Sequence, residues 1–284
     1  MKKILVTGAN GQLSSELKKL TKKSINSKFT FVGRDDMSLE DNVAITRYLN
    51  INKPDIIINA GAYTAVDKAE SEKELSEQVN HYSVDTISKW STKNNAKLIH
   101  ISTDYVFDGK SNTPYKENDP TSPINWYGET KLRSEKTIKD NATDAVVIRT
   151  SWVYSEYGNN FVKTMLRLMN KYEEISVVDD QIGTPTYALD LARVLINIIE
   201  SKSWVPGVFH YSNEGKISWY DFAVKIAQIK KLNCKVIPVS SEHYPTVAAR
   251  PNYSLLDKSK ILSTYKVSIP KWEDSLKECL QLIN

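Results

Sequence analysis

The chain has 284 residues, of which 40% are hydrophobic and 25% are charged, so it is long enough to bury one large core or two small ones. Its 38 basic and 34 acidic residues are interspersed and leave a net charge of +4, which predicts neither a nucleic-acid nor a membrane surface. The apolar run after Met1 ends at Thr7, too early for a signal peptide, and no segment has the length of a membrane span. We therefore predict a cytoplasmic protein.

The first 150 residues alternate short β-branched runs with longer segments of helical period. Runs that are apolar on both faces are typical of buried parallel strands. We predict strands at 3–7, 29–32, 56–60, 98–102 and 145–149, and helices at 13–20, 43–51, 75–90 and 127–139. This order predicts an α/β fold with a doubly wound parallel sheet of the Rossmann type.

After residue 150 the pattern is looser and prolines cluster, as in a smaller, irregular C-terminal lobe. We predict helices at 161–169, 188–199, 219–229 and 272–282, and strands at 175–178 and 208–211. We expect the chain to cross between the lobes more than once. The predicted division is a first domain over 1–150, to which 187–213 returns, and a second lobe over 151–186 and 214–284.

A turn with two glycines joins the first predicted strand to the first helix. Gly8 permits a tight turn and Gly11 a close backbone approach, whereas Ser14 stands where a third glycine is usual. Free backbone N–H groups at such a helix start attract the phosphates of a dinucleotide. The turn therefore predicts dinucleotide binding by the first domain, with a purely structural glycine turn as the alternative.

The ends of the second and third strands carry further candidate cofactor contacts. Arg34 would hold a 2′-phosphate of the adenosine ribose, whereas Asp35 or Asp36 would accept from a free 2′-hydroxyl. The sequence favours NADPH slightly and keeps NADH as the alternative. The small residues Ala60 and Gly61 would let a flat cofactor lie across the sheet edge.

Tyr127 is followed four residues later by Lys131, near the start of a predicted helix. This spacing puts the phenol and the ammonium on one helix face, where the cation would lower the tyrosine pKa. Such a phenol donates a proton to a carbonyl oxygen as a hydride reaches the carbon. Thr103, at the end of the fourth strand, would hydrogen-bond the same oxygen. The three residues predict ketone reduction.

Together these motifs resemble the extended short-chain dehydrogenase/reductase superfamily. Further stretches are similar to its dTDP-4-dehydrorhamnose reductase family: 62–70, 102–109, 149–154, 159–161, 180–186 and 250–254. The resemblance therefore extends over nearly the whole chain. The resemblance implies reduction of the C4 ketone of a dTDP-4-keto-6-deoxy-L-hexose by NADPH or NADH, which gives dTDP-L-rhamnose.

The resemblance also implies roles for individual residues. Tyr127 would be the proton donor, Lys131 would hold the nicotinamide ribose, and Thr103 would orient the ketone. The cofactor contacts would be Gly8, Asn10, Gly11, Gln12, Leu13, Arg34, Asp36, Met37, Ala60, Gly61, Ala62, Tyr63 and Thr64, together with Tyr127 and Lys131. The sugar nucleotide would contact Thr103, Asp104, Trp152 and, through its diphosphate, Arg250.

Two other functions fit the same motifs. One is reduction of a different dTDP-4-keto-6-deoxysugar, and the other is a non-catalytic regulatory subunit like the beta subunit of methionine adenosyltransferase. Related 4,6-dehydratases need a glutamate beside the aspartate that follows the Ser/Thr, and this chain has Tyr105 there. Elimination is therefore disfavoured.

The sequence predicts no metal site. Its two cysteines are far apart, and its histidines form no cluster, so we interpret each histidine as structural or exposed: Cys234, Cys279, His81, His100, His210 and His243. The one partner predicted is the small-molecule nucleotide sugar, and the expected assembly is a monomer or a homodimer.

Overall fold

A computed structural model describes residues 1–22, 27–142 and 144–283. Its central feature is a six-stranded parallel sheet with the strand order β2-β1-β3-β4-β5-β10. The strands are β1 (Lys2–Thr7), β2 (Ser27–Val32), β3 (Ile56–Asn59), β4 (Lys97–Thr103), β5 (Ala145–Thr150) and β10 (Gly207–His210). All residues of β3 and β5 are buried, as the continuous apolar runs predicted. The doubly wound α/β fold is confirmed.

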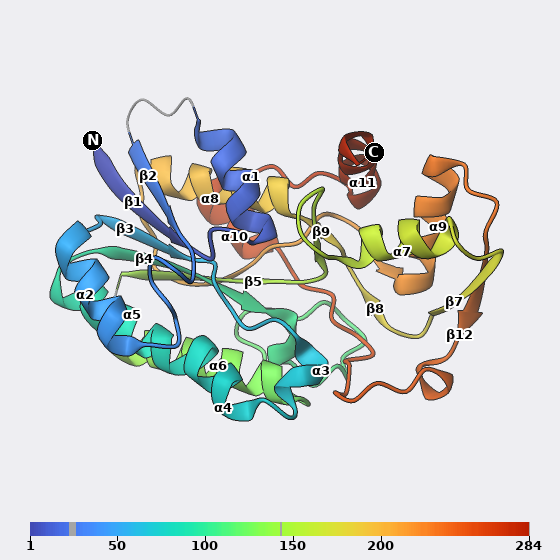
Figure 1. Cartoon of the computed structure of the whole chain (residues 1–284), viewed down its shortest axis with the longest axis horizontal. Helices are drawn as coiled ribbons and strands as arrows, with labels where there is room; N and C mark the ends of the chain where they lie inside the picture. Colours follow the sequence, from blue (N-terminus) through green and yellow to red (C-terminus); the bar gives the residue numbers. More distant parts are fainter. Residues whose placement is uncertain (23–26, 143, 284) are drawn as a thin grey trace.

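Helices cover both faces of this sheet (Figure 1). One face packs against α1 (Gln12–Thr21), α8 (Ala188–Glu200) and α10 (Ser259–Tyr265), with Leu17 and Leu195 in the shared core. The other face packs against α2 (Asn42–Asn52), α5 (Ser83–Lys93) and α6 (Trp126–Asn141), with Leu49 and Ile87 in the core. A helix layer on each side keeps water from the backbone of the parallel strands.

A second lobe lies beyond the carboxyl ends of these strands (Figure 1). Its helices are α7 (Phe161–Met169), α9 (Trp219–Lys230) and α11 (Trp272–Leu282), which enclose a core of their own around Leu166, Phe222 and Leu276. The short strands pair two by two: β6 (Val153–Tyr154) with β9 (Thr186–Tyr187), β7 (Glu174–Val178) with β12 (Lys235–Val239), and β8 (Ile182–Gly183) with β11 (Ile217–Ser218).

Two of the differences from the sequence prediction concern the helices around the main sheet. The single helix predicted at 75–90 is α4 (Lys73–Glu77), a π-helical turn η1 (Gln78–Tyr82) and then α5. No helix was predicted at α10, and its segment was assigned to the second lobe, but Tyr265 packs against Phe209 of β10, with ring centroids 5.3 Å apart. The segment 214–284 is therefore divided between the two cores.

Three short helices complete the described chain: α3 (Val66–Ala69), the 3-10 turn η2 (Asp104–Val106) and the 3-10 turn η3 (Ser241–His243). Within the described ranges, every helix is too short or too polar to cross a membrane.

His210, the last residue of β10, has a fully buried ring. Its Nδ1 lies 3.1 Å from the Tyr115 carbonyl oxygen and its Nε2 lies 3.4 Å from Arg149 Nη1. Burial, with the Arg149 charge, lowers the pKa of His210 to about 3. The folded state therefore needs a neutral ring. The contribution of His210 to the free energy of unfolding is fully present above pH 6.5 and is lost as the pH falls towards 3.

We predict that His210→Asn has a flatter pH dependence of stability than the wild type. Between pH 7 and pH 5 the unfolded wild type takes up a proton at this histidine and the folded protein does not, which removes about 2 kcal/mol. Urea unfolding at the two pH values measures the difference. Equal losses in both proteins would contradict the assignment.

Candidate active site

A cleft of about 910 Å³ opens at the carboxyl edge of the sheet, between the two lobes. Segments that follow β1, β3 and β4 line it, together with the start of α6. The strand order reverses between β1 and β3, and ligands of open α/β sheets bind outside such a switch point. The volume lies at the upper end of the range for small-molecule sites.

The turn after β1 makes the floor of this cleft. Gly8 has φ of +72°, and a Cβ there would lie 2.8 Å from the Cα of Gly61, so the turns after β1 and β3 meet without side chains between them. Ser14, which replaces the third glycine of the motif, is buried and donates from Oγ to the Thr7 carbonyl oxygen at 3.2 Å. Its hydroxyl therefore ties α1 to the end of β1.

The start of α1 fits a phosphate. Gly11 is the N-cap residue and supplies no side-chain cap, so the first N–H groups of the helix keep their hydrogen-bonding capacity. Asn10, Gly11, Gln12 and Leu13 all line the cleft there. A helix N-terminus with free N–H groups and no side chain in front of it is suited to a pyrophosphate.

The end of β2 separates the two candidates for the adenosine ribose. Arg34 and Met37 line the cleft, and the Arg34 side chain is 83% exposed, with one loose contact to Glu40 at 3.6 Å. Asp36 is outside the lining residues, and its Oδ2 accepts from the N–H of Gly33 at 2.9 Å. The Asp36 carboxylate therefore closes the turn, and the Arg34 guanidinium remains for a ligand.

After β3, the segment from Ala60 to Thr64 runs along the cleft, with one exception. Ala60, Gly61, Ala62 and Thr64 line it, but the Tyr63 phenol points elsewhere and donates to Glu72 at 2.6 Å. The Tyr63 side chain therefore does not line the cleft, and its contact with a cofactor stays a prediction.

Asn80 holds this segment in place, and the sequence analysis missed it. Its Oδ1 accepts from the Tyr63 N–H at 2.8 Å, and its Nδ2 donates to the Tyr63 carbonyl at 3.0 Å and to Thr130 Oγ1 at 3.1 Å. Asn80 sits in the π-helical turn η1, a kind of local widening that is frequent at functional sites. A helix predicted from periodicity gives no sign of such a turn.

Helix α6 brings Tyr127 into the cleft. The helix starts at the N-cap Asn125, whose Oδ1 accepts from the Gly128 N–H at 2.8 Å. A Cβ on Gly128 would lie 2.2 Å from the Tyr105 carbonyl oxygen, so α6 touches η2 backbone to backbone. This contact places Tyr127 beside Thr103, the residue that caps η2.

The Tyr127 phenol is protonated at neutral pH. Burial raises the pKa of Tyr127 to about 12, a hydrogen bond with Thr103 lowers it in part, and the Asp104 charge raises it further. Lys131 is 2% exposed, and burial lowers the pKa of its amine to about 7. Lys131 is not among the causes of the Tyr127 pKa shift in this structure, because its buried amine is only partly charged at neutral pH.

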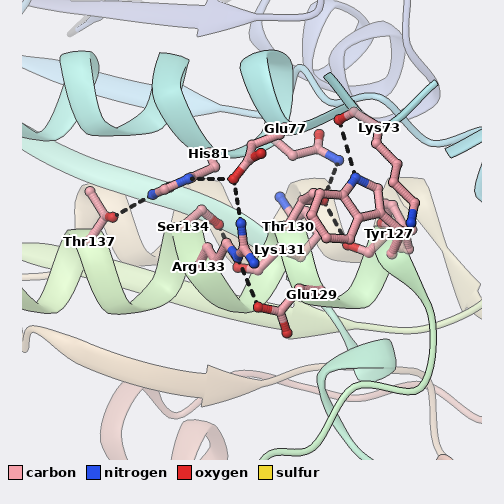
Figure 2. Close-up of polar contacts among 12 residues, drawn as sticks. Lys73, Glu77, His81, Tyr127, Glu129, Thr130, Lys131, Arg133, Ser134 and Thr137 are labelled. Carbon is pink, nitrogen blue, oxygen red and sulfur yellow. Dashed lines mark hydrogen bonds and ion pairs between the residues drawn. The ribbon is translucent and has the colours of Figure 1, made fainter. Parts of the chain in front are cut away.

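The opposite side of α6 is held by α4 and η1. Figure 2 shows Glu77 between the His81 ring and the Arg133 guanidinium, and Arg133 also donates to Glu129 at 2.8 Å. The Trp126 indole donates to the Lys73 carbonyl at 3.2 Å. These contacts fix the helix from outside the cleft.

The predicted sugar contacts Asp104 and Trp152 both line the cleft. Asp104 is buried, burial raises its pKa to about 6, and its Oδ2 has no hydrogen-bond partner within the described residues. Trp152 has φ of +49° and stacks on Trp219, with ring centroids 3.6 Å apart. Trp219 lines the cleft as well.

Arg250 is not among the residues that line the cleft. Both of its terminal nitrogens donate to Asp67, at 2.6 and 2.7 Å, and one also donates to the Ala248 carbonyl. This bidentate pair occupies the guanidinium that was predicted to contact a diphosphate.

A buried ion pair lies below the cleft and was also missed. Arg149 Nη2 is 2.7 Å from Glu135 Oε2, and Ser102 Oγ donates to Glu135 Oε1 at 2.5 Å. The periodicity of the sequence indicates only that Arg149 and Glu135 are buried. It does not show that they contact each other. Within the described ranges, no group of three or more His, Cys, Asp or Glu side chains is arranged to hold a metal ion.

Comparisons with known proteins agree with this geometry. A family model described as RmlD substrate binding domain matches residues 1–284. The chain is 38% identical to the spore coat polysaccharide biosynthesis protein SpsK of Bacillus subtilis, over 99% of this chain and 98% of that protein. It is 39% identical to a dTDP-4-dehydrorhamnose reductase of Salmonella typhimurium, over 98% of this chain and 96% of the relative. The crystal structure of a dTDP-4-dehydrorhamnose reductase of Bacillus anthracis in complex with NADP is similar, with a TM-score of 0.94, 37% identity and 99% of each chain covered.

We predict that Gly128→Ala lowers the free energy of unfolding by at least about 2 kcal/mol, because the new methyl group meets a backbone oxygen that cannot rotate away. Gly33→Ala is the matched control, since the nearest atom to its Cβ would be 3.7 Å away. Its stability should stay within about 0.5 kcal/mol of the wild type. Chemical denaturation of both variants measures this, and equal effects would refute the backbone contact.

Proposed function

Because this chain belongs to the RmlD substrate binding domain family, we propose that it reduces the C4 ketone of dTDP-4-dehydro-6-deoxy-L-mannose with NADPH, which gives dTDP-L-rhamnose. The observation that carries the proposal is the meeting of Thr103, Tyr127 and Lys131 with the glycine turn of β1 in one cleft. A proton donor and a dinucleotide site within one cleft are what ketone reduction needs.

Tyr127 is the proposed proton donor. A pKa of about 12 keeps its phenol protonated across the neutral range, so a proton is always present to be given to the ketone oxygen. Thr103, which hydrogen-bonds the phenol, orients the same oxygen. A bound reduced nicotinamide supplies the hydride.

Lys131 has two proposed tasks. Its Nζ donates to the Ile101 carbonyl at 2.7 Å, which leaves its remaining hydrogens for the nicotinamide ribose. When the amine is protonated, its charge also stabilises the phenolate that Tyr127 becomes after proton transfer. Both tasks require that Nζ stays close to the Tyr127 side of the helix.

The proposed coenzyme is NADPH. The exposed Arg34 guanidinium lines the cleft at the end of β2, where it can pair with a 2′-phosphate. Asp36, which would favour NADH, already accepts from the Gly33 N–H. The other proposed contacts are Gly8 and Asn10–Leu13 for the pyrophosphate and Met37, Ala60, Gly61, Ala62 and Thr64 along the rest of the cofactor.

The proposed sugar site is formed by Asp104 and Trp152. Asp104 has a buried oxygen free for a sugar hydroxyl, and the Trp152 ring offers a flat apolar wall. Arg250 is omitted, because Asp67 occupies its guanidinium. Burial raises the pKa of Tyr105 above the usual tyrosine range, so this residue supplies no base for elimination.

We propose that one lobe binds the cofactor and the other binds the sugar nucleotide. We assign cofactor binding to 1–150 with 187–213, since β10 completes the main sheet and α8 packs beside α1. The sugar nucleotide is assigned to 151–186 and those parts of 214–284 outside α10. Both cysteines, Cys234 and Cys279, are buried and unpaired, which supports a reducing compartment such as the cytoplasm. A monomer or a homodimer remains the prediction for the assembly.

We expect Tyr127→Phe to lower turnover at least about a hundredfold, as the loss of a general acid does, and to leave NADPH affinity near that of the wild type. The assay follows NADPH oxidation with freshly generated dTDP-4-keto-L-rhamnose. Tyr63→Phe is the control, because its phenol bonds Glu72 outside the cleft, and its turnover should stay within about twofold. Near-normal turnover of Tyr127→Phe would remove the proton-donor role, and a wild type without NADPH oxidation would refute the reductase.

A further inference from the structure

A chain of buried polar groups runs behind the cleft from the turn after β3, through the end of β1, to β4. The Gly61 N–H donates to Thr7 Oγ1 at 2.9 Å, and the Thr7 hydroxyl donates to Asn59 Oδ1 at 2.7 Å. The Oδ1 of Asn59 thus accepts from Thr7, and its Nδ2 donates to His100 Nδ1 at 3.0 Å. Thr7, Asn59 and His100 are each at most 1% exposed, so water does not compete for these bonds.

This chain decides which nitrogen of His100 carries the proton. Burial, with the Lys131 charge, lowers the pKa of His100 well below its usual value, so the ring is neutral. Because Nδ1 accepts from Asn59, the proton is on Nε2. Nε2 lies 3.0 Å from Ser134 Oγ, whose own hydroxyl donates to the Lys131 carbonyl at 2.6 Å, so the serine oxygen accepts from the ring.

The same ring edge touches the proposed catalytic lysine. Lys131 Nζ donates to the Ile101 carbonyl at 2.7 Å and lies 3.1 Å from His100 Nε2. The neutral form of the amine, which burial favours, therefore accepts from the Nε2–H through its lone pair. The acid facing Lys131 from its own helix is Glu135, and Arg149 and Ser102 occupy that carboxylate. The imidazole and one carbonyl are thus the polar contacts found for the amine within the described residues.

We infer that His100 is a positioning residue for reduction, which fixes Lys131 Nζ beside Tyr127 and links it through Asn59 and Thr7 to Gly61 in the turn after β3. The inference rests on the proposed function of Lys131. The sequence predicted a structural or exposed role for His100. Its ring also contacts Lys131 directly, which adds a role in the active site. Without this contact Lys131 Nζ keeps one polar contact, the Ile101 carbonyl, and is held less firmly in its working position.

Two substitutions of His100 separate the contacts of Nδ1 from those of Nε2. His100→Asn keeps an acceptor where Nδ1 lies, for Asn59, but has no atom near Lys131. His100→Gln reaches the position of Nε2, where its amide contacts Ser134 and Lys131. His210→Asn is the control, since it makes the same change at another fully buried strand histidine that does not line the cleft.

We expect His100→Asn to lower kcat about tenfold, the scale for a displaced catalytic group, and to raise the Kd for NADPH at least about threefold, with the KM for the sugar unchanged. His100→Gln should keep kcat and Kd within about threefold of the wild type, and His210→Asn within about twofold, whatever their melting temperatures. Fluorescence titration with NADPH gives Kd, and steady-state kinetics gives kcat and KM. A His100→Asn variant with wild-type kcat and Kd would overturn the inference, as would equal losses in the Asn and Gln variants.

The binding readout keeps this test separate from the test of the reductase. If the wild type oxidises no NADPH with any dTDP-4-keto sugar, the proposed function fails, and the ratio of the Kd values still decides the role of His100. If His100→Asn does not fold, nitrogen-15 NMR of labelled wild type replaces it. NADPH should then shift the ring resonances of His100 and leave those of His210 in place, and unshifted His100 resonances would overturn the inference.

Discussion

The direction of the six strands is the constraint on which the site depends. Because all six run parallel, every turn that leaves a strand towards the second lobe starts from the same edge. At the switch point the turns after β1 and β3 meet at Gly8 and Gly61, where neither carries a side chain. The turn after β4 brings Thr103 to the same edge, and Gly128 lets α6 approach it. The cleft is a consequence of this convergence.

Burial at this edge decides the protonation of the site. Desolvation shifts the pKa values of this phenol and this amine in opposite directions, since it favours the neutral form of each. Tyr127 therefore keeps its proton, and Lys131 loses part of its charge near neutral pH. A neutral donor suits reduction, because the reaction consumes a proton at the ketone oxygen. Behind the lysine, the buried residues His100 and Asn59 connect its amine by hydrogen bonds to the end of β1 below the cleft.

Much of the fold could be predicted from the sequence, because parallel strands leave continuous apolar runs and helices leave a 3.6-residue period. The helices predicted at 161–169 and 272–282 agree with α7 and α11 at both ends. The candidates Thr103, Tyr127 and Lys131 followed from spacing and from resemblance, and the structure brings them together. Asn80, His100 and the partner of Arg250 could not be predicted, since a π-helical turn, a buried contact between strands and a salt bridge to Asp67 depend on tertiary packing. Tyr63 was assigned to the cofactor by the family resemblance of its stretch, and the structure bonds its phenol to Glu72 outside the residues that line the cleft.

The most direct test of the account is the fate of the hydride. The enzyme is supplied with dTDP-4-keto-L-rhamnose and with NADPH that carries deuterium at both positions of the nicotinamide C4, and the product is examined by NMR. The account predicts one deuterium at C4 of the sugar and a product with the configuration of L-rhamnose. Deuterium at another carbon, or a C4 hydrogen taken from the solvent, would contradict it.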